Sequence, residues 1–132
     1  MNPQNLVPSL ETCQRLTEAG VVIDSYFVWY VPSGMLRICP KVISKDAEIN
    51  DNAPISNEIP APTASEMLAL MPRRLVVENK NNYTLEIYLD ENNYLVSYQS
   101  RIAPAYWSCV CNTLEQALAE TLIWLKGQGY LN

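Results

Sequence analysis

The sequence predicts an α+β fold, in which helices with one apolar face pack on one side of an antiparallel sheet. Two observations favour this class. Three segments carry helix-start signals followed by apolar residues at helical spacing, and the strand-like segments between them are short and separated by turn residues. The expected order is α-β-β-α-β-β-β-α. It gives a single two-layer domain over residues 1–132, with an antiparallel sheet of about five strands and the helices on one face.

The first helix is expected directly after Pro8. Ser9 has the side chain of an N-cap, and Gly20 stands where a left-handed C-cap belongs. Between them, Leu10, Cys13 and Leu16 repeat at helical spacing and form one apolar stripe.

A β-hairpin is expected next, with strands over 25–31 and 35–39 around Pro32-Ser33-Gly34. A three-residue loop would place Val28 and Tyr30 beside Leu36 and Ile38. A two-residue loop would place Trp29 and Val31 there instead. The sequence leaves open which face of the first strand is buried.

Residues 44–62 show no periodicity and contain three prolines and four acidic residues. A loop of this length inside a small domain is either functional or poorly ordered. We expect it to be mobile and solvated.

The second half begins with a predicted capping box, Thr63 to Glu66, on a short helix that ends before Pro72. Three strands follow in series, over 75–77, 83–89 and 94–98. The turn between the last two favours a register in which Leu85, Ile87 and Leu89 share a face with Tyr94, Val96 and Tyr98, because a one-residue slip would bury Glu86 and Ser97. Residues 101–111 are expected to form a loop or a short strand.

The last helix is expected to start at an Asn112-x-x-Glu115 cap. Its apolar stripe then runs through Leu114, Leu118, Thr121, Leu122 and Leu125.

Composition argues against several function classes. The chain has 14 acidic and 9 basic residues and a net charge of −5, which disfavours binding to a phosphate backbone. Histidine is absent, as are glycine-rich phosphate loops, so no familiar catalytic arrangement is present. Cys109 and Cys111 would lie side by side on a strand, but closed zinc sites need four ligands, and no metal or other cofactor is expected.

Aromatic residues give the only candidate site. Eight tyrosines and three tryptophans accompany one phenylalanine, and such amphipathic rings suit half-exposed surfaces and interfaces. Tyr88 on the outward face of its strand, together with Tyr106 and Trp107 after Pro104, form the candidate interaction surface.

Three segments carry a family resemblance. They are residues 8–13 with Gly20 and the strand 26–29, residues 61–68 with Met71-Pro72, and residues 117–125. In order and spacing the chain resembles small uncharacterised proteins encoded in bacteriophages and prophages, especially those of gut bacteria. The resemblance covers most of the chain and leaves 44–59 as the variable part. It implies a phage-derived accessory protein in a bacterial cytoplasm and carries no assigned activity or functional residues.

The expected function is therefore a non-enzymatic interaction protein that binds a host or phage protein through the open sheet face or the 101–111 loop. No apolar run approaches the roughly 20 residues that span a bilayer, so no membrane contact is expected and the location is the bacterial cytoplasm. Two alternatives stay open: a small enzyme with an undescribed site, and a weak binder of single-stranded nucleic acid. The sequence also leaves open whether the chain forms a homo-oligomer.

Overall fold

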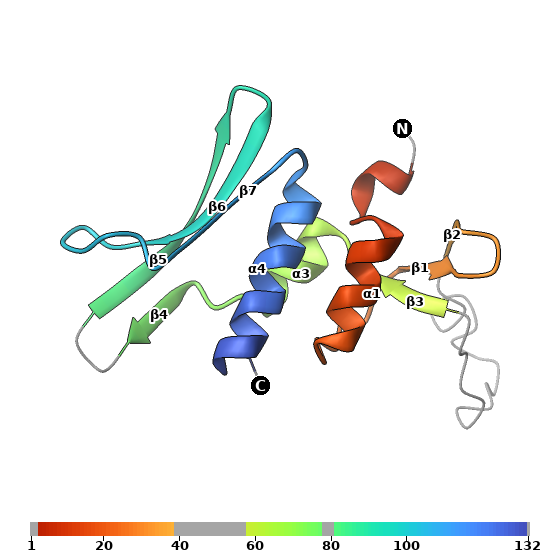
Figure 1. The fold of residues 1–132 in the computed structure, drawn as a ribbon, viewed down its shortest axis with the longest axis horizontal. Helices are drawn as coiled ribbons and strands as arrows, with labels where there is room; N and C mark the ends of the chain where they lie inside the picture. The colour runs from red at the N-terminus through yellow and green to blue at the C-terminus, as the bar shows by residue number, and fades with distance from the viewer. Residues whose placement is uncertain (1–2, 39–57, 78–80, 132) are drawn as a thin grey trace.

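A computed structural model of the chain describes residues 3–38, 58–77 and 81–131 (Figure 1). It confirms the α+β class. The described helices and strands are η1 (Pro3–Leu6), α1 (Leu10–Glu18), β1 (Phe27–Tyr30), β2 (Met35–Ile38), β3 (Glu58–Ala61), α3 (Ala64–Leu70), β4 (Arg74–Val77), β5 (Asn81–Asp90), β6 (Asn93–Gln99), β7 (Trp107–Cys111) and α4 (Leu114–Gln128).

The strands form two antiparallel sheets, whereas the sequence predicted one sheet of about five strands. One sheet has the order β2-β1-β3 and the other has the order β4-β5-β6-β7. Two of the strands lie outside the five predicted, although a short strand was one of the two alternatives for residues 101–111. β7 lies in the segment expected to be a loop or a short strand, and β3 lies at the end of the expected loop 44–62. The rest of that loop, residues 44–57, lies outside the described residues.

The two sheets stand at opposite ends of an elongated molecule, with the helices between them (Figure 1). α4 packs on β6 and β7 and also contacts α1 and α3, and α1 in turn packs on β3. Each sheet therefore has helices on one face, as the sequence predicted for a single sheet. The chain crosses from one sheet to the other through α3.

Helix ends follow the predicted capping chemistry. The Ser9 hydroxyl accepts a hydrogen bond from the Thr12 N–H, and Gly20 follows α1 with a φ of +85°, a left-handed conformation that favours glycine. The Thr63–Glu66 capping box is present in full. The start of α4 differs from the prediction. Its N-cap is Thr113, whose hydroxyl accepts from the Gln116 N–H at 3.2 Å, and not Asn112.

The register between β5 and β6 is the predicted one. Leu85 pairs with Tyr98, Ile87 with Val96 and Leu89 with Tyr94 across a two-residue turn. Burial is less regular than the register. Ser97 lies on the predicted wetter face but is completely buried, and its hydroxyl bonds to the Trp107 carbonyl and the Gln99 amide.

The β1–β2 hairpin closes through four loop residues, which neither sequence-based alternative considered. Phe27 pairs with Ile38 and Trp29 with Leu36, and the side chains of Phe27, Trp29 and Leu36 belong to the apolar cluster under α1. The face that the sequence left open is thus the Trp29 face, although Val28 on the other face is also buried. β3 pairs with β1 and is an edge strand, a position in which proline is tolerated, as at Pro60.

The larger core surrounds α4. Its predicted stripe is confirmed, and Leu118, Thr121, Leu122 and Leu125 are buried. Ala117 and Ala119 are also completely buried, so the helix is covered on more than one face. This follows from its central place, with a sheet on one side and α1 and α3 on others. Within the described residues, no helix is long and apolar enough to cross a membrane.

Candidate interaction surface

The β4–β7 sheet has one face that no described helix covers. Its other face, the inner face, carries Leu75, Tyr83, Val96 and Tyr98 into the core around α4. The alternating residues point away from α4, and we call this set the outer face. Its members are Arg74, Val76, Asn82, Thr84, Glu86, Tyr88, Leu95, Ser97, Gln99, Ser108 and Val110.

A row of apolar side chains crosses the outer face at right angles to the strands. Tyr88 on β5 pairs with Leu95 on β6, and Leu95 pairs with Val110 on β7. Tyr88 is 48% exposed and Val110 is 61% exposed, while Leu95 between them is half-buried. Side chains in directly paired positions lie about 5 Å apart, so the three form one continuous strip. We call it the outer-face row.

The remainder of the outer face is mostly polar. Arg74 and Glu86 contribute one charge of each sign. A hydrogen bond to Glu86 raises the pKa of Tyr88 above its usual value. The Ser97 hydroxyl donates to the Trp107 carbonyl at 3.0 Å and accepts from the Gln99 amide at 2.6 Å. These bonds fix the side chains beside the outer-face row.

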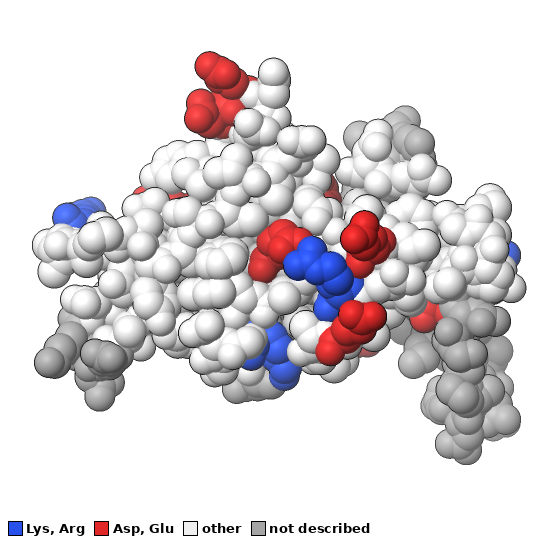
Figure 2. Space-filling view, viewed as in Figure 1, with Lys and Arg blue, Asp and Glu red and all other residues white. Residues whose placement is uncertain are grey.

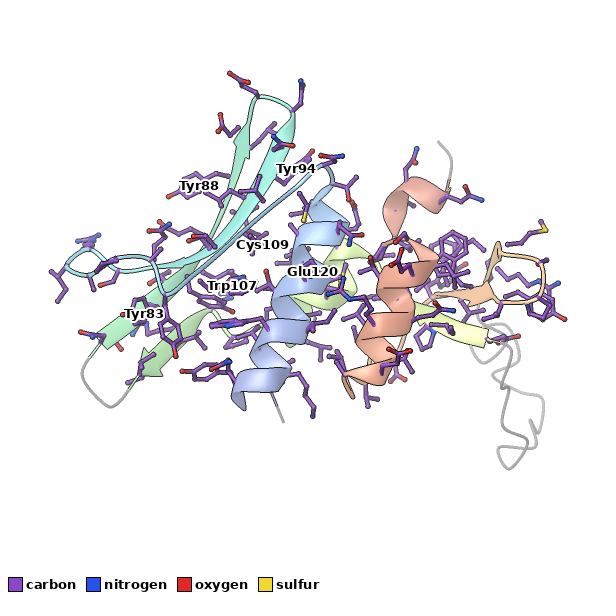
Figure 3. All side chains as sticks on the ribbon, in the orientation of Figure 1. Tyr83, Tyr88, Tyr94, Trp107, Cys109 and Glu120 are labelled. Carbon is purple, nitrogen blue, oxygen red and sulfur yellow. The ribbon has the colours of Figure 1, made fainter. Side chains whose placement is uncertain are left out.

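The structure separates the three residues of the predicted surface. Figure 3 shows Tyr88 on the side of the sheet away from α4, and Trp107 on the side that faces α4. Trp107 stacks on Trp124 with ring centroids 4.7 Å apart, and its indole N–H donates to the Thr121 hydroxyl at 3.1 Å. Trp107 is thus a half-buried packing residue that joins β7 to α4.

Tyr106 belongs to an aromatic cluster at the end of α4. Its ring stacks on Tyr83 with centroids 5.0 Å apart, and its hydroxyl lies 3.1 Å from that of Tyr130. An edge contact joins it to Trp124. Tyr106 is 36% exposed, but its ring is held on several sides, so most of its surface serves packing within the chain.

Leu95 and Val110 complete the outer-face row and were missed by sequence reasoning. The signal that could have found Val110 is the alternation in Trp107–Cys111, which reads as a strand with Ser108 and Val110 on one face. Pairing of β7 with β6 then places Val110 beside Leu95. The sequence alone did not predict this pairing, because residues 101–111 were not assigned to the sheet.

The thiols of β7 point to the inner face. Cys109 and Cys111 have sulfur atoms 3.6 Å apart, as expected for alternate residues on one strand. Burial raises the pKa of Cys109 to about 12, and its hydrogen bond with Cys111 adds to the effect. The Cys109 thiol therefore stays protonated near neutral pH. Among the described residues, no group of three or more potential ligands could hold a metal ion.

A polar network crosses the contact between α1 and α4. Arg15 makes a two-pronged ion pair with Glu120, whose second bond is 3.0 Å long. Beside it, the Gln116 amide donates to the hydroxyl of the buried Thr12 at 2.6 Å. The bond to Glu120 raises the pKa of Arg15. Figure 2 shows charged side chains gathered over α1 and α4, while the neighbouring surface over the sheet is largely uncharged.

Comparison of the chain with family models, with curated proteins and with solved structures finds no match. The interpretation of the surface depends on the geometry of the chain alone.

Proposed function

We propose that this protein is a non-enzymatic accessory protein of phage type, which acts in a bacterial cytoplasm by binding a host or phage protein on its outer face. The outer-face row carries the proposal. Tyr88, Leu95 and Val110 form an apolar strip across three strands, and tyrosine is among the residues that most often anchor protein interfaces.

The chemistry of the row favours one kind of partner. A half-exposed tyrosine beside two aliphatic side chains favours an apolar ridge on a folded protein, with polar groups at the rim that meet Glu86 and Gln99. The row itself carries no positive charge, and the chain has a net charge of −5, so a phosphate backbone is a poor partner.

A capture experiment with matched variants tests the proposal. The tagged protein is used to capture partners from lysate of the infected or lysogenic host, alongside Tyr88→Ser and a control variant, Ile102→Ser. Ile102 is 88% exposed and lies outside the sheet, so the control removes an exposed apolar side chain elsewhere. We expect Tyr88→Ser to lose at least about tenfold of a specifically captured protein, because central aromatic anchors each contribute about 2 kcal/mol or more.

Two results would contradict the proposal. Equal capture by the wild type and Tyr88→Ser would remove the outer-face row as the docking surface. Binding of labelled single-stranded DNA at low salt, lost in Arg74→Gln and retained in Tyr88→Ser, would favour a nucleic-acid binder instead. The double variant Tyr106→Ala, Trp107→Ala is not suited to this test, since both rings pack against α4 and its end.

A further inference from the structure

We infer that β7 pairs with the β7 strand of a second copy of this chain, so that two four-stranded sheets join edge to edge. The feature that points to this is the edge of β7. This inference does not depend on the proposed binding of another protein.

The four edge strands of the two sheets differ in how they are protected. β2 carries Arg37, β3 carries Glu58 and Pro60, and β4 carries Arg74. Charges and prolines on an edge strand discourage pairing with another chain. The segment Trp107–Cys111 contains neither, so β7 is the unprotected edge of the described sheets.

The burial of β7 shows that its edge is uncovered by the described part of the chain. On β6, the inner-face residues Val96 and Tyr98 are completely buried. The paired residues on β7, Cys109 and Trp107, face the same core and are only half-buried. Because α4 covers both strands from the same side, the extra exposure lies at the edge, where backbone N–H and C=O groups remain available for another strand.

A second copy fits this edge because β7 is compatible with itself. In an antiparallel pair related by a two-fold axis normal to the sheet, inner-face side chains of both copies stay on one side and both α4 helices lie on that side. No like charges are brought opposite each other, since β7 has none. Ser108 and Val110 of the two copies meet on the outer face and extend the outer-face row across the axis. Figure 2 shows that the surface over this part of the sheet is largely uncharged, which suits a close approach.

Charges of either sign introduced at Val110 test the pairing. We expect the wild type to sediment as a dimer in a concentration series. Val110→Lys and Val110→Glu should each weaken the dimer about tenfold, because each loses an apolar cross-strand contact and places like charges close together. An equimolar mixture of the two variants should restore it. Thr84→Lys is the matched control, since it adds the same charge on the same face but two strands from the edge, and it should leave the dimer unchanged.

Hydrogen exchange gives a second measurement that identifies the strand. In the dimer, the backbone amides of β7 should gain protection as the concentration rises, while those of β4 at the opposite edge should not. A wild type that is monomeric throughout the series overturns the inference. So does a dimer that Val110→Lys leaves as tight as the wild type, or one whose added protection falls outside β7. A chain that dimerises by this test but captures no protein through Tyr88 would support this inference and contradict the proposed function.

Discussion

The two sheets differ in how firmly the described structure holds them. The cluster around α4, which joins the β4–β7 sheet to α1 and α3, contains thirteen buried residues, whereas the cluster between the β2–β1–β3 sheet and α1 contains four. Residues of β6 in the larger cluster are completely buried, while most of β2 is exposed. The difference shows that the smaller sheet depends on α1, and that α1 is held in turn by α4.

The largest expected effect is the difference in unfolding free energy between a core substitution in one half and a core substitution in the other. Leu122→Ala removes a completely buried side chain of α4 and should lower the free energy of unfolding by about 3 kcal/mol. Leu36→Ala on β2, where the side chain is half-buried, should lower it by about 1 kcal/mol. Urea unfolding of both variants measures the two values, and equal losses would refute the contrast between the halves.

Removal of the buried hydroxyl of Thr121 should have the next largest effect on the free energy of unfolding. Thr121→Val keeps the shape of the side chain but leaves the Trp107 indole N–H without its acceptor, at a loss of about 1–3 kcal/mol. Thr17→Val is a matched control in α1. The Thr121 hydroxyl donates to the Ala117 carbonyl, and the Thr17 hydroxyl likewise donates to the Cys13 carbonyl four residues earlier. Thr17 is exposed, however, and its hydroxyl does not accept a bond from an indole. A similar loss in both variants would show that the indole bond contributes little.

High pH should weaken both halves. Burial raises the pKa of Cys13, in the smaller cluster, from 9.0 to about 12, and that of Tyr98, in the larger cluster, from 10.0 to about 12. Both groups are neutral when protonated, and the unfolded chain loses these protons first. Their contribution to stability is therefore complete below pH 9 and is lost as the pH rises toward 12.

Two variants separate the contributions of Cys13 and Tyr98 to this loss of stability at high pH. Cys13→Ala should flatten the decline that begins near pH 9, and Tyr98→Phe should flatten the part that begins near pH 10. The measurement is the urea unfolding free energy as a function of pH. Wild-type stability that stays constant over this range would contradict the buried state of both groups.

The ion pair between the two central helices should have the smallest effect. Arg15 and Glu120 have side-chain exposures of 46% and 24%, so solvent screens their attraction. A double-mutant cycle with Arg15→Gln and Glu120→Gln should give a coupling energy below about 1 kcal/mol, and added salt should reduce it. A coupling above about 2 kcal/mol would mean that this pair, and not apolar packing, holds α1 on α4.

Local signals made much of the fold predictable. The hydroxyl of Thr63 and the carboxylate of Glu66 specify a helix start without reference to the rest of the chain. The β5–β6 register follows from alternation and a short turn, and the stripe of α4 follows from its spacing. Each of these features depends on residues that are close in the sequence.

The features that sequence analysis missed depend on distant contacts. Glu58–Ala61 contains a proline and is a strand only because β1 provides a partner. Tryptophan is a residue type typical of exposed interfaces, yet Trp107 stacks on Trp124 and donates a hydrogen bond to Thr121. The division into two sheets follows from α4 being buried on several faces, which a single apolar stripe does not indicate. The outer-face row needed the β6–β7 register before it could be recognised.

The place of α4 along the chain has a consequence for synthesis on the ribosome. Every described strand precedes this helix in the sequence, so β5 and β6 are synthesised before the residues that cover their inner faces. At about 5–20 residues per second, the fifteen residues of α4 are added over roughly one to three seconds. The core around Val96 and Tyr98 therefore cannot close before α4 has been synthesised.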